Sequence, residues 1–291
     1  MVKEVQSIVL VPLGGLCNRL RAILSAIALA RDCRVPLRIV WLRDPGLNAN
    51  YVNLFEPLSA SSDVQVSVMD SRAWYRYGVP RRRNLFMPAL WQHYAFDTCL
   101  TEANLSSEGI EQKIRGLIQG NVFIQTGLSF YPCDDRLLLR FFRPTRIIRD
   151  MIKSRKELIT HHTIGLHIRR TDNAQSIAHS PLWAFEEAMQ RDLLRNPETT
   201  FYLATDDPTV LDTLTIRFPG KVFIGNQSQM IGKEERGQMS RNRSSLNGMQ
   251  EAVAELFTLI ACPRFHGSYW SSFSDAVVAC HEEGEADIIY V

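Results

Sequence analysis

The feature that most constrains the fold is an alternation of short apolar runs with longer segments of helical spacing. Residues 7–11 form an apolar, β-branched run, residues 18–32 repeat apolar side chains at helical spacing, and residues 37–42 are apolar again. A strand, a turn, a helix and a second strand make a βαβ unit, and such units build parallel sheets.

The same alternation returns from residue 163 and continues to the end of the chain. The expected strands are 163–168, 201–204, 222–224, 264–266 and 288–290, and the expected helices are 181–195, 208–217, 248–261 and 272–281. This second set predicts a second parallel sheet with its own core.

The stretch between these two sets is less regular. Strands are expected at 64–69 and 122–126 and a helix at 105–119. Residues 74–94 are rich in aromatic residues, arginine and proline without a clear period. We expect loops and short elements there, lining a cleft.

Length and charge both divide the chain into two domains. A chain of 291 residues, 45% of them apolar, is long enough for two cores. Residues 1–155 hold 21 Lys and Arg against 13 Asp and Glu, whereas residues 156–291 hold 12 against 18. We place the boundary near residue 155, within an expected basic helix at 145–158. The basic half either attracts an anionic substrate or nucleic acid or is simply a solvated face.

The cysteines follow neither a zinc-binding nor a CxxC spacing. They are Cys17, Cys33, Cys99, Cys133, Cys262 and Cys280. We interpret them as reduced thiols of a cytoplasmic protein. The N-terminus enters a strand without the features of a signal peptide, and no apolar run reaches the roughly 18 residues of a membrane span.

The first candidate site is the turn Gly-Gly-Leu-Cys-Asn-Arg at residues 14–19, between a strand and a helix. Glycines let the backbone approach a ligand, and a helix N-terminus offers free N–H groups. The motif predicts a phosphate or sugar cradle, although it is neither GxGxxG nor a Walker loop. The alternative is a tight βα turn with Asn18 as the N-cap.

The second candidate is Ile-Gly-Leu-His-Ile-Arg-Arg-Thr-Asp at residues 164–172, where a strand ends. Two adjacent guanidiniums suit a diphosphate, and Asp172 would orient one of them. His167 shares a face with Arg169 because side chains alternate along a strand. The alternative is a surface cluster of salt bridges.

The third candidate, Ala-Thr-Asp-Asp-Pro at residues 204–208, resembles a metal-binding Asp-x-Asp motif only superficially. Adjacent aspartates at a strand end point in opposite directions, which disfavours a shared metal. Asp207 before Pro208 predicts an N-cap, and Asp206 is expected at the cleft. We expect no metal site.

The fourth candidate is His-Gly-Ser-Tyr-Trp-Ser-Ser-Phe-Ser at residues 266–274, which joins a strand to a helix. Hydroxyls and backbone N–H groups at a helix start can bind an anion, whereas capping alone would explain one serine rather than four. On the preceding apolar helix, Glu255 is either exposed or paired, and guanine offers it two adjacent donors.

Motifs of several other enzyme classes are absent from the sequence. It contains no Gly-x-Ser-x-Gly elbow, His-Glu-x-x-His, kinase set or dehydrogenase fingerprint, and no strong paired-carboxylate signature of glycoside hydrolysis.

Taken in order, these motifs resemble the superfamily of α1,6-fucosyltransferases, nodulation fucosyltransferases and protein O-fucosyltransferases. The match is strongest over residues 160–280 and local at 8–32. The resemblance implies an α/β GT-B fold, with two Rossmann-like domains whose parallel sheets face a central cleft. Residues 1–155 would form the acceptor side and residues 156–291 the nucleotide-sugar domain. The implied reaction is inverting, metal-independent transfer of fucose from GDP-fucose to a glycan or other hydroxyl acceptor.

The resemblance also implies individual roles. Arg169 would bind the diphosphate and stabilise the transition state, with Arg170 in support. His167 and Glu255 would contact guanine. The catalytic set is Arg169, Arg170 and Asp172, and the donor-binding set is Asn18, Arg19, His167, Asp206, Glu255, Ser271, Ser272 and Phe273. The serines and Phe273 would bind phosphate, and Asn18 and Arg19 would face the sugar-phosphate.

The sequence departs from the family at several positions. Glu255 stands where the family usually has Asp, Phe185 where relatives carry Tyr, and Asn173 where the α1,6 enzymes carry Lys. Their N-terminal coiled coil, SH3-like tail and secretory disulfides are also missing. The acceptor therefore stays open, and Asp172, Glu186 and Glu187 are candidates for its base.

Three other readings compete with fucose transfer. The chain could use another nucleotide sugar on the same scaffold, since fold does not fix the sugar. It could be a non-catalytic glycan- or nucleotide-binding module, or a nucleic-acid binder using its basic half. We expect no nucleic-acid partner, no membrane span and no cofactor beyond the donor substrate.

Overall fold

The computed structural model describes residues 3–44, 46–58, 64–170, 174–225 and 245–291. The chain separates into two compact units, Met1–Thr145 and Arg146–Val291. The predicted boundary lay near residue 155, inside the helix Arg146–Lys156 (α7). The whole of α7 belongs to the second unit because it packs against the helix Leu246–Ile260 (α12) of that unit.

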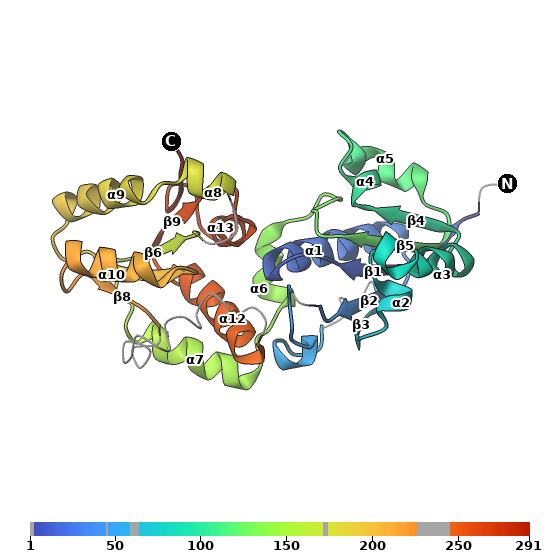
Figure 1. Cartoon of the computed structure of the whole chain (residues 1–291), viewed down its shortest axis with the longest axis horizontal. Helices are drawn as coiled ribbons and strands as arrows, with labels where there is room; N and C mark the ends of the chain where they lie inside the picture. Colours follow the sequence, from blue (N-terminus) through green and yellow to red (C-terminus); the bar gives the residue numbers. More distant parts are fainter. Residues whose placement is uncertain (1–2, 45, 59–63, 171–173, 226–244) are drawn as a thin grey trace. The chain divides into compact units, whose positions relative to one another are not determined.

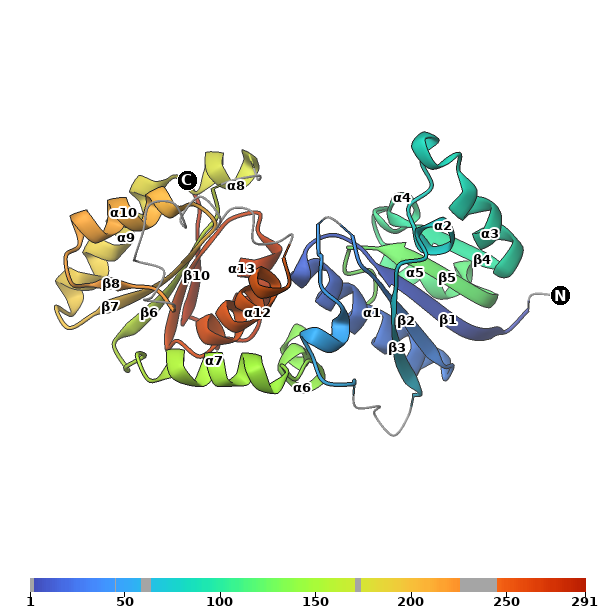
Figure 2. The same cartoon turned by 60° about the horizontal axis from the view of Figure 1, so that its bottom comes forward.

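The first unit contains a five-stranded parallel sheet in the order β3-β2-β1-β5-β4. Its strands are β1 (Val5–Pro12), β2 (Leu37–Leu42), β3 (Val66–Ser71), β4 (Thr98–Thr101) and β5 (Gly120–Thr126). Its helices are α1 (Leu16–Cys33), α2 (Trp74–Tyr77), α3 (Met87–Ala95), α4 (Glu102–Leu105), α5 (Ile110–Leu117), α6 (Leu138–Phe141) and the short 3-10 turns η1 (Tyr51–Asn53), η2 (Arg82–Asn84) and η3 (Asp135–Leu137). Helix α1 lies on one face of the sheet, and α2 and α3 lie on the other (Figures 1 and 2).

The second unit contains another five-stranded parallel sheet, in the order β10-β9-β6-β7-β8. Its strands are β6 (Thr163–Ile168), β7 (Thr200–Thr205), β8 (Val222–Phe223), β9 (Arg264–Ser268) and β10 (Ala286–Ile289). Besides α7 and α12, its helices are α8 (Ala174–His179), α9 (Leu182–Arg195), α10 (Pro208–Arg217) and α13 (Ser272–Val278). Helices α9 and α10 cover one face of this sheet, and α7, α12 and α13 cover the other (Figure 2).

The alternation of side chains along β6 decides which residues reach the site. Ile164, Leu166 and Ile168 point into a core with Phe185 of α9 and Leu214 of α10. His167 therefore lies on the opposite face, the one that α12 and α13 cover. Gly165 shares that face, where an added Cβ would lie 2.9 Å from the Leu259 side chain of α12.

The structure confirms the two expected α/β sets and corrects the stretch between them. Residues 74–94, expected as loops and short pieces, include most of the nine-residue helix α3. Strand β4 was not predicted from the sequence. The helix expected at 105–119 is α5, which begins only at Ile110 after Gly109, its N-cap with a φ of 71°, and the short helix α4 precedes it. Helix α1 begins at Leu16 with Gly15 as its N-cap, so the alternative of Asn18 as N-cap is wrong.

The described residues contain neither a candidate membrane span nor a candidate metal cluster. No helix there is long and apolar enough to cross a membrane. No group of three His, Cys, Asp or Glu side chains in that part of the chain is placed to hold a metal ion.

Candidate functional site

The site lies at the carboxyl ends of β6, β7 and β9 in the second unit. Strand β6 pairs with β7 on one side and with β9 on the other. The chain leaves β6 towards β7, whereas β9 is reached only much later in the sequence. The connections therefore diverge above β6 and β9, and such a switch point is where open α/β sheets bind ligands.

His167, the second-last residue of β6, is held in one orientation by α13. Its Nδ1 atom lies 2.8 Å from the Ser274 hydroxyl, and its ring stacks on Phe273 with centroids 4.6 Å apart. Burial, and then the neighbouring Arg169 charge, lower the pKa of His167 to about 4. The imidazole is therefore neutral at physiological pH, and it can take part in hydrogen bonds without adding charge.

Arg169 follows β6 and is anchored through its backbone. Its N–H donates to the Ser268 hydroxyl at 3.0 Å, and that hydroxyl donates to the His167 carbonyl at 3.1 Å. The guanidinium Nη1 lies 3.7 Å from Asp206 Oδ2, and the side chain is 14% exposed. The backbone of Arg169 is thus fixed to β9, while its guanidinium lies beside the end of β7.

Arg170 takes a different direction from its neighbour. Its N–H donates to Asp206 Oδ1 at 2.7 Å, and its guanidinium donates to the carbonyls of Ile177 and Ser180 at 3.3 and 2.7 Å. The two guanidiniums therefore have separate surroundings, as the alternation of successive side chains requires. Arg170 ties the end of β6 to the C-terminal end of α8, and its predicted support for Arg169 stays a prediction.

The two adjacent aspartates after β7 contact different partners. Asp206 contacts both Arg169 and the backbone of Arg170. Asp207 is the N-cap of α10, where its Oδ1 accepts the Thr209 N–H at 2.9 Å. This confirms Asp207 as an N-cap and places Asp206 beside the arginines, with the two carboxylates serving different partners.

Glu255 is a half-buried carboxylate on α12. Burial raises its pKa to about 7; the Arg155 charge opposes this rise, and the charges of Glu251 and Asp206 add to it. Arg155 itself is buried and is paired with Glu251. Within the described residues, no group donates a hydrogen bond to the Glu255 carboxylate, so its acceptor capacity is open to a ligand.

The loop from β9 to α13 carries the predicted serines. Ser271 is the N-cap of α13 without a side-chain capping bond and is 4% exposed, and Ser272 opens the helix. Trp270, just before them, has a φ of 55°, an uncommon left-handed conformation for a bulky residue. Such strain is typical of functional loops.

The fourth candidate motif contained Ser268 and Ser274, but the sequence analysis gave these two serines no role, although they organise this site. Ser268 links the ends of β6 and β9, and Ser274 holds His167. A signal for Ser274 existed: it lies three residues after Ser271, so both share one face of α13. Ser268, at the end of a buried strand, had no such signal.

Several predicted residues lie elsewhere or outside the described part. Asp172 is outside the described residues, as are Thr171 and Asn173. Glu186 pairs with Arg217 at 3.1 Å on the face of α9 and α10, and Glu187 is exposed.

Asn18 and Arg19 belong to the first unit, at the turn after β1. Gly14 has a φ of 78°, and a Cβ there would lie 2.9 Å from Asn18 Nδ2, so glycine is needed at this position. Arg19 is completely buried and donates to the carbonyls of Gly14 and Leu42 at 2.9 and 2.7 Å. It also pairs with Asp44 at 2.7 Å. Arg19 therefore braces the turn, and the predicted contact of these two residues with the donor stays a prediction.

Comparison with known proteins adds two kinds of likeness. The chain is 24% identical over 243 residues to nodulation protein Z of Bradyrhizobium diazoefficiens. That match covers 76% of this chain and 63% of the relative, so the chain spans less than two thirds of the curated protein. No protein-family model matches the sequence.

Solved structures share the fold over nearly the whole chain. The NodZ α-1,6-fucosyltransferase co-crystallised with GDP superposes with a TM-score of 0.63 at 17% identity, covering 94% of this chain and 91% of NodZ. POFUT1 in complex with GDP gives a TM-score of 0.57 at 10% identity, covering all of both chains. A mutant of Arabidopsis thaliana FUT1 with GDP gives 0.55 at 14%, covering 97% of this chain and 72% of FUT1. The fold is therefore the GT-B type of these fucosyltransferases, and the resemblance inferred from the motifs is confirmed.

Proposed function

We propose that this chain is a fucosyltransferase that transfers fucose from GDP-fucose to a hydroxyl of a glycan acceptor, with inversion and without a metal ion. The observation that carries the proposal is the cluster of His167, Arg169, Asp206 and Glu255 around the switch point of the second sheet. This cluster combines the Arg169 cation, which suits a diphosphate, with the Glu255 carboxylate, which suits the guanine base of the nucleotide. NodZ and POFUT1, both solved in complex with GDP, share the same fold.

The arginine at the end of β6 supplies the electrostatics of the reaction. In a direct displacement the acceptor oxygen bonds to the anomeric carbon, and the bond from that carbon to the β-phosphate oxygen breaks. The electron pair leaves with GDP, so negative charge grows on the diphosphate. The Arg169 backbone is anchored to β9 and its guanidinium is already placed beside Asp206, so it stabilises that charge with little reorganisation. The acceptor proton goes to a base, for which Asp172 stays the predicted candidate.

The carboxylate of Glu255 suits the Watson–Crick edge of guanine. Guanine N1–H and its exocyclic amine are two adjacent donors, and a carboxylate accepts both. Adenine presents an acceptor at N1, which would face the carboxylate unfavourably. The raised pKa of about 7 means that part of Glu255 is protonated at neutral pH. GDP affinity is therefore expected to increase as the pH rises through 7, where the carboxylate becomes fully ionised.

The two units have different parts in this proposal. The second unit binds the nucleotide, and the first supplies the acceptor side, with Asn18 and Arg19 at the turn after β1. We keep the prediction of a cytoplasmic location, where cysteine thiols stay reduced.

Thermal shift with a nucleotide panel tests the donor. The panel is GDP, GDP-fucose, GDP-mannose, UDP, UDP-glucose and ADP, each with and without EDTA. A ligand at one hundred times its dissociation constant should stabilise the fold by about 2.7 kcal/mol. We expect stabilisation by GDP and GDP-fucose, unchanged by EDTA, and a smaller response to GDP in Glu255→Gln.

Other outcomes of the panel would contradict parts of the proposal. A preference for UDP or ADP overturns guanine recognition, and a response that EDTA abolishes overturns metal independence. Stabilisation by GDP-mannose equal to that by GDP-fucose overturns selection of fucose at the binding step. Release of GDP from GDP-fucose that depends on an added glycan then measures transfer itself.

A further inference from the structure

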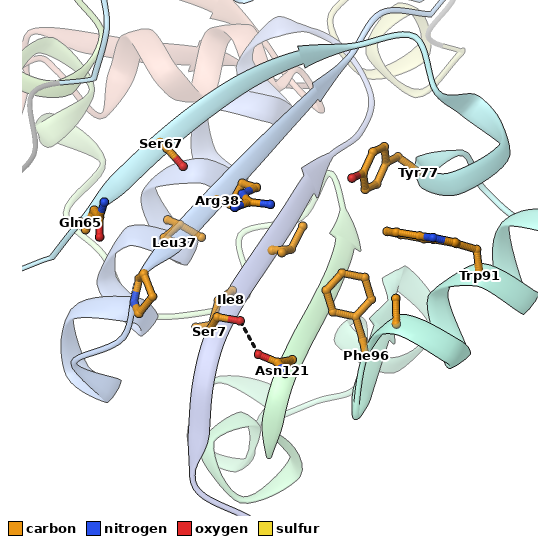
Figure 3. A pocket seen from close by; sticks show the side chains of 13 residues that line it. Ser7, Ile8, Leu37, Arg38, Gln65, Ser67, Tyr77, Trp91, Phe96 and Asn121 are labelled. Carbon is orange, nitrogen blue, oxygen red and sulfur yellow. Dashed lines mark hydrogen bonds between the residues drawn. The ribbon is translucent and has the colours of Figure 1, made fainter.

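A cavity lies in the first unit, on the sheet face that α2 and α3 leave partly open (Figure 3). It has a volume of about 470 Å³, within the range of small-molecule sites. Its floor includes Ser7 and Val9 of β1, Arg38 of β2, Ser67 of β3 and Asn121 of β5. Its wall is made by aromatic residues of the segment 74–96.

The residue pattern of the strands that form the floor shows that this face of the sheet is not fully covered. Parallel sheets usually have both faces covered, and their strands are then apolar throughout. Strand β3 instead alternates half-buried and exposed residues, with Ser67 and Met69 exposed. Val9, Arg38 and Ser67 form one row across the sheet, because the register pairs Val9 with Arg38 and Arg38 with Ser67. This row carries polar groups where a covered sheet would carry apolar ones.

The aromatic wall is rigid. Trp91 packs edge-to-face against Tyr77, with centroids 5.1 Å apart, and against Phe96 at 5.6 Å. Figure 3 shows the Trp91 ring extending over the sheet between these two rings. Gln92, which is buried, donates to the carbonyls of Arg76 and Gly78 and so joins α3 to α2. The cavity is therefore already formed and needs little ordering to bind a ligand.

A buried amide fixes the wall to the sheet in the same way. Gln125 of β5 donates to the Tyr77 carbonyl at 2.6 Å. On the floor, the Ser7 hydroxyl donates to Asn121 Oδ1 at 2.7 Å. Among the described residues nothing accepts from the Asn121 NH₂ group, so it can donate to a ligand.

The lining chemistry matches a neutral sugar. Aromatic rings pack against the apolar C–H face of a pyranose, while hydroxyl and amide groups serve its hydroxyls as donors and acceptors. Ser7, Gln65, Ser67 and Asn121 supply these groups, and among the described lining residues only Arg38 carries a charge. A nucleotide would need more positive charge for its phosphates. A peptide strand would need a sheet edge, whereas this cavity lies on a face.

The cavity is separate from the predicted sites. It lies at the amino ends of β1, β2, β3 and β5, whereas the Gly14 turn follows the carboxyl end of β1. About 16 Å of strand separates Ser7 from Pro12. We propose that this cavity is a carbohydrate-binding site that holds a neutral pyranose unit of a glycan at a distance from the Gly14 turn. The site is a binding property of the first unit, and its test does not require transferase activity.

Fluorine NMR of the whole chain labelled with 5-fluorotryptophan tests this site. The probes are the neutral oligosaccharides cellotriose, chitotriose and maltotriose at millimolar concentration, with sialyllactose and GDP as charged comparisons. The Trp91 signal is assigned with Trp91→Phe. We expect at least one neutral oligosaccharide to shift the Trp91 signal, while Trp183 and Trp270 of the second unit stay unchanged.

Substitutions at exposed positions keep the result interpretable. Ser67→Tyr fills the cavity and Arg38→Ala removes a donor, and both should weaken oligosaccharide binding at least tenfold. Met69→Tyr, on the same strand and face but outside the lining, should bind as the parent does. All three should keep the response to GDP, which reports on the second unit.

The possible results separate this proposal from the proposed function. A Trp91 shift by a neutral oligosaccharide that Ser67→Tyr abolishes supports the carbohydrate site, even if GDP gives no response anywhere. No shift with any neutral oligosaccharide overturns the site, even if GDP stabilises the chain. A shift only with sialyllactose or GDP also overturns it, because the ligand class would then be anionic.

Discussion

The two units each place an arginine just beyond the first strand of a parallel sheet, and the two arginines do different work. Arg19 is completely buried, and its guanidinium is bonded to two carbonyls and a carboxylate while lying 5.1 Å from the Trp41 ring. Arg169 is fixed through its backbone, and its guanidinium lies 3.7 Å from Asp206. Arg19 thus braces its own turn, whereas Arg169 lies beside the carboxyl end of β7, where the proposed function expects the diphosphate.

The largest effect expected is on folding, from Arg19→Met. The substitution removes the ion pair with the partly exposed Asp44 and leaves the Gly14 and Leu42 carbonyls without the Arg19 donor, and each buried acceptor left unpaired costs about 1–3 kcal/mol. Urea unfolding measures the loss. Arg31→Met, an exposed position on the same helix, is the control and should change stability by less than about 0.5 kcal/mol. Equal stability of the two variants would show that Arg19 is not a brace.

The next effect expected is on catalysis, from Arg169→Ala. Removing a preorganised charge from a leaving group lowers kcat by about 100- to 1000-fold. Folding should change little, because the backbone bond that anchors Arg169 to Ser268 of β9 does not depend on the side chain. Arg170→Ala should instead lower the unfolding free energy. It loses two hydrogen bonds to the end of α8 and leaves the Ile177 and Ser180 carbonyls without this donor. Turnover near the parent value in a folded Arg169→Ala protein would remove Arg169 from the mechanism.

A third prediction concerns the pH dependence of stability at the second site. Burial raises the pKa of Glu255 to about 7, so its contribution to folding is present at acid pH and is lost as the pH rises through 7. The unfolding free energy of the parent should therefore fall relative to Glu255→Gln between about pH 5 and pH 8. Because the residue is only half-buried, we expect a change of about 2 kcal/mol.

The fourth prediction concerns the loss of unfolding free energy at acid pH, which we assign to His167. Its pKa is lowered to about 4, so its contribution is present above pH 6.5 and is lost as the pH falls towards 4. Urea unfolding of the parent and Glu255→Gln across the pH range separates the two groups. A difference between them that stays constant with pH would contradict the raised pKa of Glu255.

The fold could be predicted where local pattern and tertiary environment agree. The ranges of β2, β6 and α10 match the sequence reading residue for residue, because buried central strands and an Asp-Pro helix start leave a clear pattern. Strand β4 was missed because its four residues, Thr-Cys-Leu-Thr, form a strand mainly through pairing with β5. Helix α3 was missed because several of its large apolar residues, Met87, Leu90 and Tyr94, are exposed, so they do not mark a buried face at helical spacing.

The sequence could predict which residues of the site lie near one another, but it could not predict their individual contacts. Strand alternation correctly grouped His167 with Arg169 and separated Asp206 from Asp207. The pattern could not tell that Arg19 would be enclosed by its own turn, because Leu42 and Asp44 come from another strand and the loop after it. It also could not give the partner of His167, since Ser274 is brought there by the packing of α13 on β9.

The smallest effect compares two adjacent residues, Asp206 and Asp207. Asp207 caps α10 through Thr209, so Asp207→Ala should cost about 1 kcal/mol in unfolding free energy and leave kcat unchanged. Asp207→Ser, which keeps a capping oxygen, should recover most of that loss. Asp206→Asn should instead change kcat, because it removes the charge beside Arg169 while keeping an oxygen for the Arg170 N–H. A fall in kcat from Asp207→Ala that Asp207→Ser does not restore would show that the two aspartates share one function.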